Sequence, residues 1–147
     1  MEGLRPLFNF VSMITYNIEK DLDVDEFKSV LIRSTLGERR PVDDHRRMTA
    51  MVRNANLIIT ARDNGVLVGV SRSISDYAFC TYLSDLAVDV KYQKAGIGKE
   101  LIRRTKLETP DAKLILLAAP DARGYYPKIN MTQFEYCFLL DDVHQLK

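Results

Sequence analysis

The chain has 147 residues, of which 46% are hydrophobic and 28% are charged, and its formal net charge at pH 7 is +1. This length predicts one domain over residues 1–147 that buries a core without covalent cross-links. The near-neutral charge argues against a dedicated nucleic-acid-binding protein. No apolar run approaches the roughly 20 residues of a membrane span, and residues 1–15 lack the pattern of a signal peptide. We therefore expect a cytoplasmic protein with neither nucleic acid nor membrane as a partner.

The two cysteines, Cys80 and Cys137, are isolated in the sequence. Neither belongs to a Cys-x-x-Cys or Cys/His pattern, so we interpret both as small buried apolar residues. The sequence thus predicts no metal site and no disulfide.

The first third of the chain predicts one strand followed by one helix. Residues 1–10 are a possible N-terminal arm, and Val11–Asn17 alternates in polarity as a strand does. Asp21 or Asp23 can cap a helix that ends before Gly37. The buried face of this helix is expected to contain Phe27, Val30 and Leu31.

A second helix is expected after the loop Glu38–Val42, which contains Pro41. Asp43 or Asp44 can cap it. An apolar stripe of this helix, which we assign to the core, is formed by Met48, Met51 and Val52.

The centre of the chain predicts antiparallel strands. Leu57–Arg62 and Val66–Ser73 flank Asp63-Asn64-Gly65, and this turn indicates a hairpin because Asn and Gly tolerate positive φ. Tyr77–Val88 is expected to form a third long strand.

The last third predicts a β-α-β unit and a final strand. A helix from Gly96 to about Leu107 precedes the short apolar strand Leu114–Leu117. Pro120–Lys128 is expected to be a short helix and Phe134–Leu140 the last strand. The order predicts an α/β fold with a single mixed, mostly antiparallel sheet flanked by helices.

The strand that ends at Leu86–Val88 runs into a glycine-bearing turn and a helix, where we expect an anion to bind. Helix N-terminal N–H groups are unpaired, and glycine lets a phosphate approach them. A P-loop requires a glycine at Gln93 and Ser or Thr at Glu100, and a dinucleotide fingerprint requires glycine at Leu101. Neither pattern fits.

The remaining pattern, Gln93-x-x-Gly96-Ile97-Gly98, resembles the acetyl-CoA-binding motif of the GCN5-related N-acetyltransferases, and the element order matches that family from about residue 12 to 140. A second segment, Tyr125-Tyr126-Pro127-Lys128-Ile129-Asn130-Met131, resembles the family's late Tyr-x-Lys-x-Gly-Phe segment. Asn130-Met131 departs from Gly-Phe, although Asn tolerates a left-handed helix stop and Met can replace an aromatic ring in packing.

The resemblance implies acetyl-CoA as co-substrate, bound at a central β-α-β unit. It implies that Tyr126 is the catalytic proton donor to the leaving thiolate, with Tyr125 as the fallback. It also implies a bulge in the preceding strand, whose backbone groups pair with the pantetheine arm. The expected cofactor-binding residues are Leu86, Ala87, Val88, Gln93, Lys94, Ala95, Gly96, Ile97, Gly98, Lys99 and Tyr126.

The general base is not apparent in the sequence. By resemblance, Tyr82 and Ser84 face the acceptor, and neither is a strong base. Asp85 has the opposite strand parity, so a capping or salt-bridge role is at least as well supported as catalysis. We assign no role to the remaining acid–base candidates, Glu38, His45 and His144.

Between Lys91 and Lys106 there are six basic residues and one acidic residue, Glu100. Such a field favours phosphate, although it is also typical of a solvated helix face.

The sequence as a whole predicts an acetyl-CoA-dependent N-acetyltransferase that acts on an amine of a small molecule or a protein. The alternative is a non-catalytic acyl-CoA-binding module, and a structural protein with an empty loop is a third hypothesis. The identity of the amine acceptor and the formation of a homodimer stay open.

Overall fold

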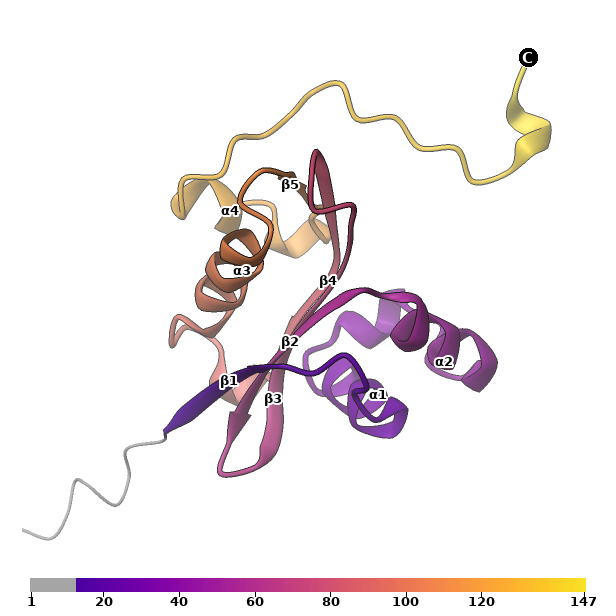
Figure 1. Ribbon diagram of the computed structural model, residues 1–147. Coiled ribbons are helices and arrows are strands. Elements are labelled where there is room, and N and C mark those ends of the chain that lie inside the picture. Colours follow the sequence, from indigo (N-terminus) through magenta and orange to yellow (C-terminus); the bar gives the residue numbers. More distant parts are fainter. Residues whose placement is uncertain (1–12) are drawn as a thin grey trace, which may run out of the picture. The chain divides into compact units, whose positions relative to one another are not determined.

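The computed structural model describes residues 13–147 (Figure 1). The described residues fall into two compact units, 13–117 and 118–147, which are described separately. The predicted N-terminal arm and the first two residues of the first predicted strand lie outside the described residues.

The first unit contains one five-stranded sheet with the strand order β1-β2-β3-β4-β5. The first three pairings are antiparallel, and β4 pairs with β5 in parallel. The predicted mixed sheet is therefore confirmed. Its strands are β1 (Ile14–Ile18), β2 (Leu57–Asp63), β3 (Val66–Ser75), β4 (Cys80–Val88) and β5 (Lys113–Ile115).

The hairpin between β2 and β3 forms where the sequence predicts it. Asn64 and Gly65 have φ values of 53° and 87°, the two positive values that a type I′ turn requires. This turn matches the twist of the flanking strands, so the local sequence fixes the pairing.

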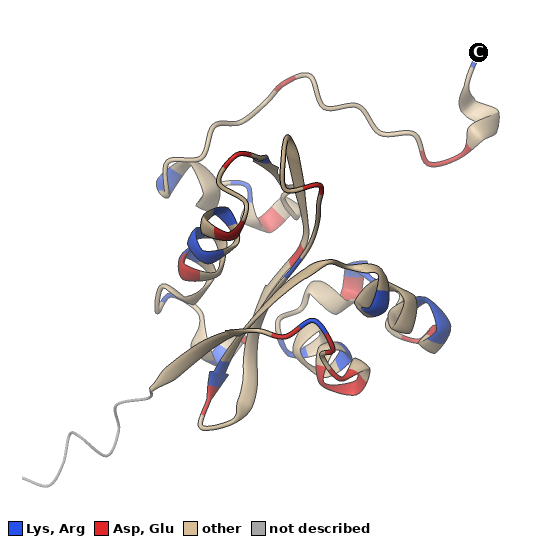
Figure 2. Cartoon of the chain, viewed as in Figure 1, with Lys and Arg blue, Asp and Glu red and all other residues tan. Residues whose placement is uncertain are grey.

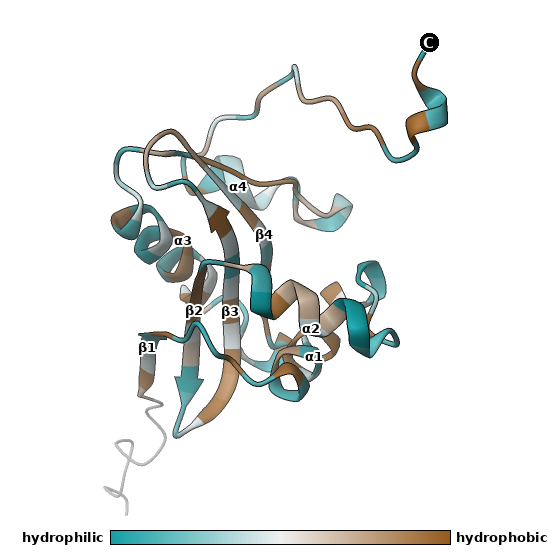
Figure 3. Cartoon of the chain, turned by 45° about the vertical axis from the view of Figure 1, so that its right-hand side comes forward, coloured by the Kyte–Doolittle hydropathy of each residue, from teal (hydrophilic) through white to brown (hydrophobic). Residues whose placement is uncertain are grey.

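Helices cover both faces of the sheet (Figure 1). One face packs against α1 (Val24–Arg33) and α2 (His45–Asn54), and the other packs against α3 (Ile97–Glu108). Figure 3 shows that hydrophobic residues concentrate along β2 and β3 between these layers. On the α1 and α2 side the core includes Phe27, Val30, Leu31, Met48, Val52, Ile58 and Val70, and on the α3 side Leu57, Ile59, Ala61, Val68, Ile97 and Leu101.

The N-terminal caps of α1 and α2 are Asp23 and Asp44, rather than the alternative candidates Asp21 and Asp43. The Asp23 carboxylate accepts the Glu26 N–H at 3.0 Å, and Asp44 accepts the Arg47 N–H at 3.1 Å. The first helix ends at Arg33, before the predicted stop at Gly37. A short 3₁₀ helix, η3 (Leu36–Arg39), occupies part of the predicted loop.

The strand β4 begins at Cys80 rather than at Tyr77, because Asp76 holds the preceding residues in a turn. Its carboxylate accepts the backbone N–H groups of Ala78, Phe79 and Cys80 at 2.9, 2.7 and 3.0 Å. The prediction that both cysteines are buried is wrong. Cys80 lies at the exposed start of β4, and Cys137 is exposed in the C-terminal segment.

The second unit contains the short helices η5 (Pro120–Ala122), α4 (Tyr125–Lys128) and η6 (Val143–Gln145). The predicted helix over Pro120–Lys128 is thus two short helices. The predicted last strand, Phe134–Leu140, is wrong: residues 118–147 contain no strand, and Glu135 and Tyr136 form a turn. A strand requires a partner edge, which a period-two pattern does not supply.

None of the helices within residues 13–147 combines the length and the apolar character needed to cross a membrane.

Candidate functional site

The strand β4 carries a bulge at its centre. Arg72 of β3 pairs with Asp85, while the next residue of β3, Ser73, pairs with Leu83. Ser84 is therefore an extra residue on β4, and such an insertion bends and twists a strand.

Close to this bulge β4 separates from β5. The parallel pairing runs from Cys80 and Lys113 to Tyr82 and Ile115, where it ends. From Leu83 to Val88, β4 pairs with β3 alone among the described strands. One edge of this half of β4 therefore presents backbone groups that no neighbouring strand satisfies.

Two arginines hold the bulge in place. Asp85 is fully buried, and its carboxylate accepts hydrogen bonds from the Nε atoms of Arg40 and Arg72. Arg40 also donates to the Ser84 carbonyl at 2.8 Å, and Arg72 donates to the Ser84 hydroxyl at 3.0 Å. The salt-bridge interpretation of Asp85 is thus confirmed. The sequence did not predict the role of Arg40, because its partner lies 45 positions away and no short sequence pattern indicates such a distant ion pair.

The turn after β4 is held by its own polar side chains. Gln93 donates through Nε2 to the Val88 carbonyl at 3.0 Å. Asp89 accepts the Lys91 N–H at 2.9 Å and forms an ion pair with Arg33 at 2.5 Å. Although burial raises the pKa of Asp89, the hydrogen bonds from Lys91 and Arg33 outweigh it and lower this pKa. Contacts within the protein therefore hold the backbone of this turn in its conformation.

The same turn presents a run of unpaired donors. Lys94 and Gly96 have φ values of 68° and 84°, and α3 begins directly after Gly96. The first hydrogen bond of this helix runs from Glu100 N–H to the Gly96 carbonyl at 3.0 Å. Within the described part of the chain, no backbone N–H from residue 93 to 99 donates to a protein acceptor. Such a run at a helix N-terminus suits an anion.

Position 96 favours glycine because its backbone φ is positive, not because neighbouring atoms leave no room for a side chain. A Cβ atom built there has no neighbour within 4 Å, so the space beside the loop is open. Left-handed backbone conformations disfavour side chains, most of all β-branched ones.

The six basic residues between Lys91 and Lys106 divide into those whose side chains bind other protein groups and those whose side chains are exposed and form no ion pair within the described residues. Figure 2 shows charges of both signs along α3. Arg103 and Arg104 both donate to Glu100, at 2.8 and 2.9 Å, and Lys106 donates to the Ala112 carbonyl at 2.6 Å. The cluster members that are exposed and form no ion pair within residues 13–147 are Lys91, Lys94 and Lys99.

The second unit positions Tyr126 on the short helix α4. Asn130 ends this helix with a φ of 73°, and the Met131 N–H donates to the Tyr126 carbonyl at 3.0 Å. The expected left-handed stop at Asn130 is therefore confirmed. The rings of Tyr125 and Tyr126 meet edge to face, with centroids 5.3 Å apart. Burial, and then the neighbouring Tyr125, raise the pKa of Tyr126.

The other acid–base candidates are dispersed. Glu38 lies on η3, His45 begins α2, and His144 lies on η6; all three are exposed. Within residues 13–147, no group of three or more His, Cys, Asp or Glu side chains is arranged to hold a metal ion.

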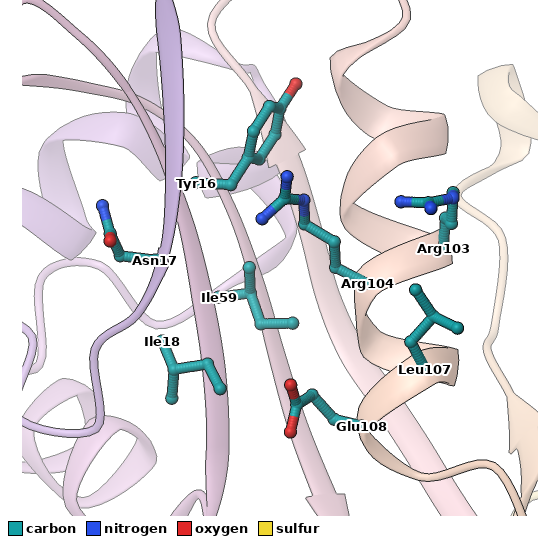
Figure 4. Close-up of a pocket in the computed structure, with 8 residues that line it drawn as sticks. All are labelled: Tyr16, Asn17, Ile18, Ile59, Arg103, Arg104, Leu107 and Glu108. Carbon is teal, nitrogen blue, oxygen red and sulfur yellow. The ribbon is translucent and has the colours of Figure 1, made fainter.

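A hollow of about 480 Å³ lies between β1 and α3 (Figure 4). The Arg104 guanidinium lies over the Tyr16 ring there, 4.5 Å from its centroid. None of the predicted cofactor-binding residues lines this hollow, so it is distinct from the turn after β4. Its lining residues are Tyr16, Asn17, Ile18, Ile59, Arg103, Arg104, Leu107 and Glu108.

The family model described as an acetyltransferase (GNAT) domain matches residues 33–133. The chain belongs to the GNAT acetyltransferase family. A relative from Pyropia yezoensis, named an uncharacterized N-acetyltransferase ycf52, is 26% identical over 141 residues, which cover 83% of this chain and 80% of that protein.

Solved structures share the GNAT fold. A probable acetyltransferase from meticillin-resistant Staphylococcus aureus, SA2161, superposes with a TM-score of 0.70 at 18% identity and covers 90% of this chain and all of its own. The aminoglycoside N-acetyltransferase AAC(6')-Iy, solved in complex with CoA, superposes with a TM-score of 0.69 at 12% identity and covers 90% of this chain and 97% of its own. These similarities support the fold of this GNAT protein.

Proposed function

We propose that this GNAT protein is an acetyl-CoA-dependent N-acetyltransferase that transfers the acetyl group directly to an amine of a small molecule or a protein. The observation that carries the proposal is a run of backbone N–H groups over residues 93–99, none of which donates to an acceptor within residues 13–147. This run lies directly after the half of β4 that leaves β5. The complex of AAC(6')-Iy with CoA supports CoA as the ligand class.

In this proposal the turn binds the pyrophosphate of acetyl-CoA. Two adjacent anionic groups need several donors in a small volume, and backbone N–H groups at a helix start provide them at no desolvation cost to a side chain. Lys94 and Lys99 add positive charge near the phosphates.

The acyl arm binds along the free edge of β4. Ala87 is 2% exposed and its side chain belongs to the core, so the contribution of Leu86–Val88 comes from backbone N–H and C=O groups. One such N–H polarises the thioester carbonyl as a backbone oxyanion donor does.

The reaction forms a C–N bond and breaks the C–S bond of the thioester. The neutral amine attacks the carbonyl carbon, the thiolate leaves, and Tyr126 gives it a proton. The raised pKa of the Tyr126 phenol keeps that proton in place at neutral pH. The proton lost by the amine passes to water, since the Asp85 carboxylate is held by two arginines. Water then returns a proton to the Tyr126 phenolate, which restores the donor.

A panel of small amines and peptides tests the proposal, with release of free CoA thiol as the readout and CoA binding measured by calorimetry in parallel. Turnover on any amine supports the proposed function. Tight binding without turnover across the panel selects the non-catalytic binding module instead. The absence of both binding and turnover overturns the assignment of the loop.

A further inference from the structure

The turn between β4 and α3 contains a strained residue. Lys94 has a φ of 68° and lies in the left-handed region, which lysine disfavours because its Cβ atom crowds the backbone. Such a conformation persists only where the surrounding structure fixes it. The backbone N–H groups of residues 93–99 therefore keep one arrangement only if other contacts hold the chain beside them.

One such contact ties the turn to the hairpin of β2 and β3. The Tyr92 hydroxyl donates to the Asp63 carboxylate at 2.5 Å, and the Tyr92 ring packs against the core cluster on the α3 side of the sheet. Asp63 is the last residue of β2 and directly precedes Asn64-Gly65, so its position is set by a turn that the local sequence determines. Tyr92 and Asp63 are called the Tyr92 anchor below.

A second contact reaches the turn from the opposite face of the sheet. Arg33, the last residue of α1, donates to the Asp89 carboxylate at 2.5 Å and to the Leu67 carbonyl of β3 at 2.8 Å. The Asp89 backbone N–H donates to the Val68 carbonyl at 2.8 Å. One guanidinium thus joins α1, β3 and the start of the turn. Arg33 and Asp89 are called the Arg33 anchor below.

The chain is fixed again at the first residue of α3. Ile97 is 3% exposed and belongs to the core on the α3 side, so only Gln93–Gly96 lie between it and Tyr92. A segment this short, held at both ends, has little conformational freedom. Donors that are arranged before the ligand binds lose less conformational entropy on binding, which increases affinity.

We propose that Tyr92 and Arg33 are positioning residues for the cofactor, which hold the N–H groups of the pyrophosphate-binding turn from opposite faces of the sheet. They act through the backbone of the turn and not by contact with acetyl-CoA. This inference rests on the proposed function, because it concerns the same site. It predicts that loss of either anchor weakens ligands with a pyrophosphate and spares ligands without one.

The first test is Tyr92→Phe, which keeps the ring and its packing but removes the donor to Asp63. Calorimetry should show a dissociation constant for CoA about three- to tenfold higher, the effect of one hydrogen bond. An NMR titration with pantetheine, which lacks the pyrophosphate, should show the parental affinity. Tyr77→Phe is the matched control, because the Tyr77 hydroxyl donates to the Asn56 carbonyl at the other end of β2; this variant should bind both ligands as the parent does.

A double-mutant cycle tests whether Tyr92 acts through Asp63. Asp63→Ala should raise the dissociation constant for CoA about as much as Tyr92→Phe does. The two substitutions together should raise it no further, because both remove the same hydrogen bond. Losses that multiply would contradict the Tyr92 anchor.

The Arg33 anchor is tested by rescue. Arg33→Met removes the ion pair with Asp89 and should weaken CoA binding without changing pantetheine binding. Arg33→Lys keeps the charge, but a single ammonium does not replace the planar fork that spans Asp89 and the Leu67 carbonyl. It should therefore recover part of the lost affinity. A parental affinity for CoA in Arg33→Met would contradict this anchor.

A measurement without ligand separates this inference from the proposed function. Backbone amide order parameters of residues 93–99 should be about 0.85 in the parent, the value of a rigid backbone, and should fall toward about 0.6 in Tyr92→Phe and Arg33→Met. Unchanged order parameters and parental CoA affinity in both variants overturn the positioning role and leave the proposed function in place. Equal weakening of CoA and pantetheine indicates a general defect of the fold and overturns the positioning role alone. A parent protein that binds no CoA overturns the proposed function and this inference with it.

Discussion

Arg40 lies 45 residues before Asp85 in the sequence, yet its guanidinium donates both to the buried Asp85 carboxylate and to the Ser84 carbonyl beside it. The residue that follows η3 is thereby fixed to the bulge of β4. Arg72 binds the other oxygen of Asp85 and also donates to the Met51 carbonyl on α2. The helical segment before β2 and the bulge therefore form one connected polar network.

We expect Asp85→Asn to destabilise the fold strongly. The substitution keeps the shape of the side chain but leaves Arg72, which is 7% exposed, without a counter-charge. Breaking a buried ion pair costs about 3–5 kcal/mol, and urea unfolding measures the loss. Arg53→Met is the control, since Arg53 is exposed and forms no ion pair within the described residues. A loss below about 1 kcal/mol, the size of an exposed pair, would contradict the role of the network.

A pH dependence of stability is expected from the turn before β4. The backbone N–H groups of Phe79, Ala78 and Cys80 lower the pKa of Asp76 from 3.8 to about 2. A lowered folded-state pKa means that the ionised carboxylate favours the folded state. Its contribution is full above pH 3.8 and is lost as the pH falls toward about 2.

The measurement compares the free energy of unfolding of the parent with that of Asp76→Asn across this range. The difference between them should be constant near neutral pH and should shrink between about pH 4 and pH 2. A difference that stays the same down to pH 2 would show that the turn does not depend on the charge.

The elements that the sequence predicts correctly depend on short-range chemistry. Asn64-Gly65 dictates its own turn, Asp23 and Asp44 cap helices within three residues of themselves, and Gly96 precedes a helix start. Each outcome is decided by residues a few positions apart, so a local pattern is sufficient.

The features that the sequence does not predict depend on distant partners. The alternation of β4 predicts that Asp85 points to the other face from Tyr82 and Ser84, but it does not identify Arg40 as the partner of Asp85. The alternation of Phe134–Leu140 describes a side-chain pattern that suits a strand, whereas a strand forms when another edge supplies hydrogen bonds. The exposure of Cys80 likewise follows from the Asp76 turn and from its position at the start of β4 rather than from the preference of cysteine for cores.

Gly96→Val is expected to weaken acetyl-CoA binding by tenfold or more, because its side chain occupies the open space where the pyrophosphate is proposed to bind. Gly65→Val is a matched control: Gly65 has a φ of 87° against 84° at Gly96, and neither position has an atom within 4 Å of an added Cβ. Both variants bear similar backbone strain. Calorimetry should show the loss of affinity in Gly96→Val alone. Equal affinities in two folded variants would contradict the assignment of residues 93–99 as the pyrophosphate-binding turn.

The exposed lysines should favour CoA over dephospho-CoA to different degrees. Lys91, Lys94 and Lys99 are exposed and form no ion pair among the described residues, whereas Arg103 pairs with Glu100 and is expected to contribute less. Each alanine variant should lose about 1 kcal/mol or less of binding free energy, and the loss should decrease with salt. Lys28→Ala on α1, across the sheet, is the control. Affinity that is indifferent to salt would assign the lysines to an ordinary solvated surface.

The proposed proton donor is tested by Tyr126→Phe, which keeps the ring and removes the hydroxyl. General acid catalysis is typically worth about 10²- to 10⁴-fold, so turnover should fall within that range while acetyl-CoA affinity stays nearly constant. Tyr125→Phe is the matched control, because it removes the neighbouring hydroxyl from the same short helix. It should retain most of the parental turnover.

The pH profile and the leaving group separate proton donation by Tyr126 from a packing role. Because burial raises the pKa of the Tyr126 phenol above its ordinary value of 10.0, the parent should keep its donor through mildly alkaline pH and lose activity from this group only above that value. Acetyl thioesters with a more acidic thiol need less proton donation, so they should recover part of the rate lost in Tyr126→Phe, whereas a packing defect would slow all thioesters equally. A parental rate for Tyr126→Phe under conditions where chemistry limits turnover would move the role to Tyr125, to water, or to no residue.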